Sequence, residues 1–250
     1  MGAVPLPPWL DAGAATARGI GRLLDYTLLK PEATREDVFR LCDTAAGAGT
    51  WAVCVNGAWV APCVRRLRGT EVRVAAVVDF PLGAASGAAK AAEAAIAVAD
   101  GATELDMVIP LGAAKAGDWS AVADDVAQVT SAVGTTLVKA IIESALLGPE
   151  EIRRACVAAV AGGARFVKTS TGFHPSGGAS LAAVRLMRAA VGPMIGVKAS
   201  GGVRTSEQAL GMLAGGASRI GLSSLDGLRA IMGPDAPLLP ELLAQAAAPR

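Results

Sequence analysis

Short runs of apolar residues recur along the chain, and segments with helical periodicity separate them. The runs are rich in Val, Ile and Ala, and their length suits strands that are buried on both faces. We therefore predict eight strands, at residues 23–29, 51–55, 72–80, 103–109, 136–143, 164–170, 194–200 and 217–223.

The intervening segments carry the start and stop signals of helices. Thr34 stands before "REDVFR" with Asp37 three residues later, and Thr205 stands before "SEQAL" with Gln208 in the same position. Both arrangements are typical of a capping box, in which two orphan backbone N–H groups are satisfied reciprocally. Further helix starts are predicted at Ser86, Asp118 and Pro149, and glycine stops at Gly101, Gly163 and Gly216.

Regular alternation of strands and helices predicts parallel βαβ units. Eight such units, with helices of about ten or more residues between the strands, match the size of a closed barrel. A doubly wound open sheet is the rival, but no G-x-G-x-x-G follows the first strand. We predict an α/β fold, a single-domain (β/α)8 TIM barrel at residues 23–250, preceded by a tail or short helix at residues 1–22.

Polar side chains share one parity within the predicted strands. In "ELDMVI", for example, Glu104 and Asp106 alternate with apolar residues. Because helices cover the outside of such a barrel, the apolar parity should face outward and the charged parity inward. A satisfied salt-bridge network without chemistry remains an alternative, although desolvation makes buried ion pairs a poor source of stability. The predicted interior charges are Asp25, Glu104, Asp106, Lys139, Glu143, Lys168 and Lys198.

Two lysines end neighbouring predicted strands, Lys168 in "ARFVKTS" and Lys198 in "MIGVKAS". Because the carboxyl ends of the strands form the catalytic face of a barrel, both ammonium groups should enter one pocket. Repulsion between unit charges about 5 Å apart is worth about 3 kcal/mol at an effective dielectric of 20. We expect this repulsion to leave one amine uncharged, as Schiff-base chemistry requires. Asp106 could relay protons there, or form a salt bridge to Lys139 or Lys198.

Glycines and serines after the last strands predict a phosphate site. Gly201 and Gly202 follow the seventh strand, and Ser223 and Ser224 follow the eighth. Gly172, after the sixth strand, could complete the ring. Loops after strands seven and eight are a common phosphate site of barrels, although plain tight turns would have the same sequence.

Composition narrows the classes of function. The formal net charge is +1 and basic residues form no long run, so nothing favours a nucleic-acid or membrane partner. The four cysteines lack metal-type spacing and read as reduced core thiols, and a single histidine argues against a His-cluster zinc site. We expect no metal and no cofactor. The amino end lacks a signal-peptide pattern, and we expect a cytoplasmic protein.

The motifs "LLDYTLLKP", "FPLG", "ELDMVI", "FVKTSTGF" and "GVKASGGVRT" together resemble the 2-deoxyribose-5-phosphate aldolase family, from about Leu23 onward. The resemblance implies a class I aldolase that reversibly cleaves 2-deoxy-D-ribose 5-phosphate to glyceraldehyde 3-phosphate and acetaldehyde, in deoxyribonucleotide catabolism. It further implies that Lys168 forms the Schiff base, Lys198 perturbs it and assists proton transfer, and Asp106 donates and accepts protons.

The chain departs from the family pattern at three positions. Tyr26 stands where histidine is frequent, Asp79 where glycine is, and Pro110 where asparagine is. Tyr26 is on the outward parity, whereas the other two end strands at the mouth and bear on substrate range. The alternatives are a phosphosugar isomerase or another non-Schiff-base barrel enzyme, with Asp106 or Glu143 as base, and a non-catalytic phosphosugar-binding protein. Whether barrels pair into a homo-oligomer is left open.

Overall fold

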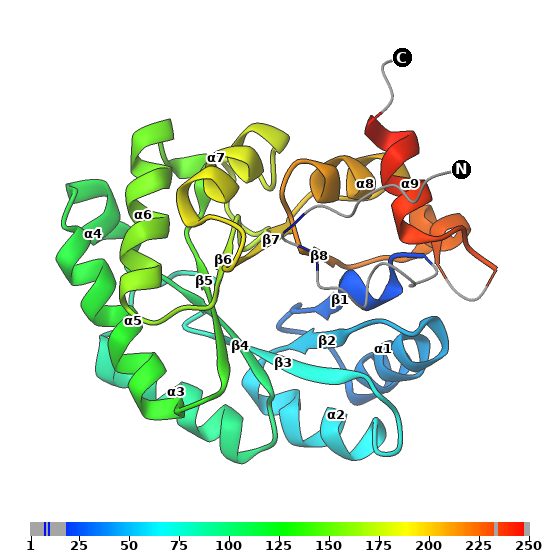
Figure 1. Cartoon of the computed structure of the whole chain (residues 1–250). Helices are drawn as coiled ribbons and strands as arrows, with labels where there is room; N and C mark the ends of the chain where they lie inside the picture. The colour runs from blue at the N-terminus through cyan, green and yellow to red at the C-terminus, as the bar shows by residue number, and fades with distance from the viewer. Residues whose placement is uncertain (1–7, 9, 11–18, 233–234, 248–250) are drawn as a thin grey trace.

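The computed structural model describes residue 8, residue 10, and residues 19–232 and 235–247. Within this part of the chain, parallel strands close into a barrel in sequence order, as the ribbon in Figure 1 shows. The predicted fold class and all eight predicted strands are confirmed, with somewhat shorter ends. The strands are β1 Leu24–Leu28, β2 Ala52–Val55, β3 Arg73–Val78, β4 Glu104–Val108, β5 Leu137–Ile141, β6 Phe166–Lys168, β7 Gly196–Ser200 and β8 Arg219–Leu222.

Helices cover the outside of the barrel (Figure 1). The predicted capping boxes are present: the Asp37 N–H donates to the Thr34 hydroxyl at 3.3 Å, and the Thr34 N–H donates to the Asp37 carboxylate at 2.9 Å. Thr205 and Gln208 repeat the pattern. The α-helices are α1 Arg35–Ala48, α2 Val60–Arg66, α3 Gly87–Ala99, α4 Leu111–Ala116, α5 Trp119–Val133, α6 Pro149–Ala161, α7 Leu181–Val191, α8 Ser206–Ala214 and α9 Leu239–Ala247, and the 3-10 turns are η2 Gly21–Leu23, η3 Gly57–Trp59, η4 Ser144–Leu146 and η5 Asp226–Ile231.

The expected alternation with long helices is wrong in three places. Helix α2 spans only Val60–Arg66, β4 is followed by two helices, and the 3-10 turn η5 follows β8. A Cβ at Gly227 would lie 1.9 Å from the Arg204 carbonyl oxygen, so η5 packs directly against the loop between β7 and α8.

The two ends of the chain are described in part. Most of the predicted segment 1–22 lies outside the described residues, and η2 is the first element there. At the other end, α9 packs beside α8 (Figure 1), and its described residues do not line the cavity considered below. Of the helices in the described ranges, none combines the length and apolar character needed to cross a membrane.

The strands are covered by two apolar layers. The larger core lies between strands and helices and includes buried Leu105, Met107 and Ile142, which belong to the outward parity. Buried Cys42, Cys63 and Cys156 are free thiols, as predicted. A smaller cluster, Leu29, Ala52, Cys54, Ala75 and Val77, fills the interior beside β2 and β3. One side of the barrel interior is therefore apolar, and the charged residues are confined to the other.

A buried ion cluster outside the barrel interior anchors the loop between β3 and α3. The fully buried Lys90 ammonium donates to the Asp125 carboxylate at 2.8 Å and to the Val108 carbonyl at 2.9 Å. It also lies 3.5 Å from the Asp79 carboxylate. Asp79 has φ of 47°, a left-handed conformation that favours glycine, and its carboxylate accepts the Ala85 N–H at 2.9 Å. Lys90 thus fixes the loop that carries Phe80.

We expect Lys90→Met to lower the free energy of unfolding by about 3–5 kcal/mol, because it leaves the buried Asp125 carboxylate without its cation. The double variant Lys90→Met/Asp125→Leu should recover part of that loss, since it removes both buried charges. Urea unfolding of both variants measures the difference. A double variant less stable than Lys90→Met would contradict the assignment.

Candidate active site

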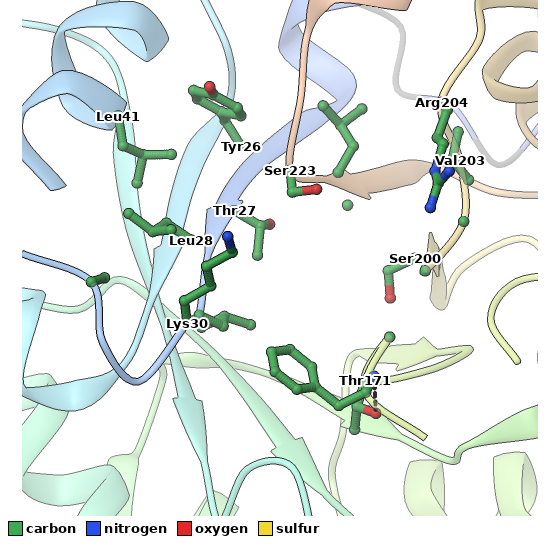
Figure 2. Close-up of a pocket in the computed structure, with 18 of the residues that line it drawn as sticks. Tyr26, Thr27, Leu28, Lys30, Leu41, Thr171, Ser200, Val203, Arg204 and Ser223 are labelled. Carbon is green, nitrogen blue, oxygen red and sulfur yellow. Dashed lines mark hydrogen bonds between the residues drawn. The ribbon is translucent and has the colours of Figure 1, made fainter. Parts of the chain in front are cut away.

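A cavity of about 820 Å³ opens at the carboxyl ends of the strands. Its lining comes from β1, β6, β7 and β8, from the loops that follow them and from helix α1, and Lys168 and Lys198 both line it. Figure 2 shows the mouth, with Thr27 and Lys30 on one side and Ser200 and Arg204 on the other. The predicted meeting of the two lysines in one pocket is therefore confirmed.

Register brings the two lysines together. Lys168 on β6 is the direct partner of Lys198 on β7, and both side chains are on the inward parity. The two ammonium groups donate to the same oxygen of Asp106, at 2.8 Å from Lys168 and 2.7 Å from Lys198. A carboxylate therefore lies between the two cations, which corrects the expectation of direct repulsion: attraction to Asp106 offsets it.

Asp106 is the centre of a larger buried ion network. Its second oxygen accepts from Lys139 at 2.7 Å, and Lys139 lies 2.6 Å from the Glu104 carboxylate. The predicted salt bridges of Asp106 to Lys139 and to Lys198 are both present. Lys198 also donates to Asp25. All these side chains are buried, as strand parity predicted.

The network contains one more cation than carboxylates when every group is ionised. The carboxylates are those of Asp25, Glu104 and Asp106, and the cations are Lys139, Lys168, Lys198 and Arg219. A buried charge without a partner is costly in a medium of low polarity. Loss of one proton from one lysine would therefore make the numbers of positive and negative charges in this network equal.

The three lysines differ in their carboxylate partners. Burial alone would lower the pKa of Lys198, but the carboxylates of Asp106 and Asp25 outweigh burial and raise it. The pKa of Lys139 is also raised, because Asp106, Glu104 and Asp25 outweigh burial. Burial would likewise raise the pKa of Asp106, yet the surrounding lysines hold it well below the usual range. Lys168 has a single carboxylate contact, with an Asp106 that two other lysines share.

Sequence reasoning missed two residues of this interior. Arg219 on β8 donates to Asp25 at 2.9 Å and to Glu104 at 3.2 Å, and its inward parity in "SRIGL" could have revealed it. Gly221 makes room for Lys198, because a Cβ there would lie 2.9 Å from the Lys198 Cε atom. This glycine therefore lets the lysine reach across the interior.

An aromatic pair walls the space above Lys168. The Phe80 and Phe173 rings meet edge to face, with centroids 5.2 Å apart at 85°. The Lys168 nitrogen lies 5.8 Å from the Phe80 centroid. The contact was missed because it joins two loops far apart in the sequence. The Lys168 nitrogen is therefore close enough to the Phe80 ring for a cation–π contact.

Glu143 secures the loop after β6. It lies beyond the end of β5 with φ of 50°, so strand parity does not govern its side chain. Its carboxylate accepts the Thr171 hydroxyl at 2.6 Å and the Thr171 N–H at 3.2 Å. The Thr171 hydroxyl in turn accepts the Phe173 N–H at 3.1 Å. Glu143 is thus a buried clamp on the loop, with its carboxylate engaged.

Four of the five residues predicted for phosphate line the cavity: Gly172, Gly201, Gly202 and Ser223. Gly201 and Gly202 have φ of 85° and 84°, a left-handed conformation open to glycine. The predicted position of Ser224 is wrong. Ser224 does not line the cavity, and its hydroxyl donates to the Asp226 carboxylate at 3.1 Å. Arg204 and Lys30, which the sequence analysis did not single out, enter the lining (Figure 2).

The three departures from the family pattern differ in position. Tyr26 packs against the outer core, as its parity predicted, and also lines the cavity. Asp79 and Pro110 do not line it. Asp79 precedes Phe80, whose ring contacts the cavity residue Phe173, and Pro110 begins helix α4 as its N-cap.

Comparison with known proteins agrees with this geometry. Residues 22–231 match the DeoC/LacD family aldolase model. The curated "Deoxyribose-phosphate aldolase" of Mycobacterium avium (strain 104) is 53% identical over 221 residues, covering 85% of this chain and 98% of the relative. "Deoxyribose-phosphate aldolase 1" of Bacillus licheniformis is 52% identical over 206 residues, covering 82% and 92%.

Solved structures show the same architecture. The tetrameric deoxyribose phosphate aldolase from Aeropyrum pernix has a TM-score of 0.78 and 31% sequence identity, covering 84% of this chain and 88% of that chain. These comparisons show that the barrel, with its two buried lysines bonded to one carboxylate, is an aldolase barrel. The chain belongs to the DeoC/LacD aldolase family.

The network should make stability depend on acid pH. Burial alone would raise the pKa of Glu104, but Lys139 and Arg219 outweigh burial and lower it. A depressed carboxyl pKa stabilises the fold above its unfolded value of about 4.3, and this contribution is lost as pH falls through the folded pKa.

We therefore expect the free energy of unfolding to fall less steeply from pH 5 to pH 3 in Glu104→Gln than in the parent protein. Glu71→Gln, at a largely exposed ion pair with Arg22, serves as the control with a parent-like slope. Equal slopes for Glu104→Gln and the parent, measured by urea unfolding, would show that the network does not titrate as described.

Proposed function

We propose that this protein is a class I deoxyribose-phosphate aldolase. It cleaves 2-deoxy-D-ribose 5-phosphate reversibly to D-glyceraldehyde 3-phosphate and acetaldehyde through a Schiff base on Lys168. The observation that carries the proposal is the Asp106 oxygen shared by Lys168 and Lys198 on one side of the cavity. The names of relatives that cover most of the chain support the substrate.

The first half of the cycle forms the covalent adduct. In its neutral form the Lys168 amine attacks the C1 aldehyde of the open-chain sugar, and the carbinolamine loses water to give an iminium ion. Asp106, 2.8 Å from the Lys168 nitrogen, can take up and return protons during this dehydration. Lys198 keeps its own proton and so maintains positive charge beside the reacting nitrogen.

The second half breaks the carbon–carbon bond. Removal of the C3 hydroxyl proton cleaves the C2–C3 bond, releases glyceraldehyde 3-phosphate and leaves an enamine on Lys168. Protonation at C2 regenerates an iminium ion, and water releases acetaldehyde and the free amine. Asp106 is the group placed to move these protons, with Lys198 2.7 Å from it. The phosphate would lie in the cradle of Gly172, Gly201, Gly202, Ser223 and Arg204.

A phosphosugar isomerase is less well supported. Such an enzyme needs a carboxylate base that faces the substrate, and the two candidates were Asp106 and Glu143. Asp106 is bonded to three lysines, and Glu143 is bonded to Thr171. Glu143 is therefore held on the Thr171 loop, and an isomerase would not require the two ammonium groups that flank Asp106.

The cellular setting follows from the same proposal. We place the enzyme in the cytoplasm, in deoxyribonucleotide catabolism, with no nucleic-acid or membrane partner. We also propose that it needs no metal and no cofactor, because the lysine supplies the electron sink. A homo-oligomer is favoured by the tetramer named for the Aeropyrum relative.

Borohydride reduction in the presence of acetaldehyde tests the covalent step. We expect an ethyl adduct on the peptide that contains Lys168, found by peptide mass mapping, and no adduct in Lys168→Leu. Lys115→Leu, at a surface ion pair with Glu151, should be labelled like the parent. An adduct confined to another lysine, or none in the parent, would refute the mechanism.

Turnover should also depend on both lysines of the pair. Lys168→Leu should abolish cleavage, and Lys198→Leu should lower kcat nearly as far, because it removes the cation that stabilises the reacting centre. Chelation with EDTA should leave the rate unchanged. Near-parent turnover of Lys168→Leu, or a clear loss of activity with chelator, would contradict the proposal.

A further inference from the structure

The cations that line the cavity fall into two groups. Lys168 and Lys198 belong to the buried network, Arg40 pairs with Glu36 and Asp37, and Arg229 pairs with Asp226. Within the ranges that the structure describes, the side chains of Lys30 and Arg204 form no ion pair. Their charges are therefore available to an anionic ligand.

Lys30 stands on an anchored loop. The preceding Leu29 is buried, and its carbonyl accepts the Asn56 side-chain amide at 3.2 Å. The Lys30 carbonyl accepts the Ala33 N–H at 3.1 Å, which closes a turn just before helix α1. The backbone is thus held on both sides, while the exposed side chain extends into the cavity (Figure 2).

Barrel closure brings this loop to the phosphate cradle. Strand β1 is hydrogen-bonded to β8, with Asp25 in register with Gly221. The loop that follows β1 therefore stands beside the loop of Ser223 at the same end of the barrel. Arg204 enters the cavity from the opposite side in Figure 2. A phosphate group bound in the cradle would lie between the two cations.

A phosphate monoester carries close to two negative charges at neutral pH. Arg204 can balance one of them, and the backbone N–H groups of the glycine loop carry no net charge. Glu32 also lines the cavity but forms no ion pair with Lys30. A second cation is required to balance the dianion, and a flexible lysine can supply it as a point charge.

We propose that Lys30 binds the substrate phosphate and makes the cavity select phosphorylated over unphosphorylated sugars. The inference rests on the proposed function, since it concerns the same cavity, and it adds a specificity-determining residue outside the glycine and serine cradle.

Comparison of two substrates tests this role. For Lys30→Met we expect kcat/KM on 2-deoxyribose 5-phosphate to fall about 10–100-fold, the loss typical of a charged hydrogen bond, mostly through KM. On unphosphorylated 2-deoxyribose the change should stay within about twofold, and Lys30→Arg should retain most of the preference. Arg66→Met, which removes a paired surface cation outside the cavity, is the control and should leave kcat/KM on both substrates unchanged.

An equal loss on both substrates, or no loss on the phosphorylated one, would overturn the proposal. A failure of the aldolase assignment is recognised separately, because the parent protein would then give no borohydride-trapped adduct.

Calorimetric titration with glycerol 3-phosphate decides the role of Lys30 independently of turnover. The parent and Arg66→Met should bind this probe with similar Kd, and Lys30→Met should bind it at least about tenfold more weakly. Glycerol should bind to none of them. Equal Kd values for the parent and Lys30→Met would refute the role even if cleavage were normal.

Discussion

The carboxylate of Asp106 is the contact on which the interior of this barrel depends. It accepts hydrogen bonds from Lys139, Lys168 and Lys198, which come from three consecutive strands. Without that negative charge three ammonium groups would be buried close together, at a cost of several kcal/mol for each unpaired ion. The arrangement exists because parallel strands in register place side chains of one parity in the same enclosed space.

Sharing one carboxylate among several cations leaves the ion network short of negative charge. Lys198 and Lys139 have further carboxylates and remain charged, whereas Lys168 has only its share of Asp106. The Lys168 nitrogen also lies 5.8 Å from the centroid of the Phe80 ring, which contacts Phe173 edge to face. Lys168 is therefore the lysine of the network with the fewest carboxylate contacts. In the proposed mechanism, the neighbouring Lys198 ammonium supplies positive potential at the Lys168 nitrogen.

Strand parity predicted most of the interior, because a period of two residues is independent of the rest of the fold. The eight strands and the buried charges of β1, β4, β5, β6 and β7 followed from it. The position of Asp106 between two lysines did not, since it depends on register across strands. Arg204 and Lys30 line the cavity from loops, and Phe80 stands on a loop held by the contact of Lys90 with Asp79. The paths of these loops depend on barrel closure and on contacts between residues far apart in the sequence. Glu143 was assigned to a strand, yet its left-handed backbone turns it toward Thr171.

The surplus of positive charge is tested most directly by the pH dependence of kcat/KM in two variants. One variant removes a positive charge from the network, and the other removes a negative charge. In the proposed mechanism, removal of a cation in Lys139→Met weakens the positive potential at the Schiff-base nitrogen and should move the acid limb of the kcat/KM profile to higher pH. Removal of a carboxylate in Glu104→Gln should move that limb to lower pH. Shifts in opposite directions would support the account, whereas shifts in the same direction, or no shift in either variant, would contradict it.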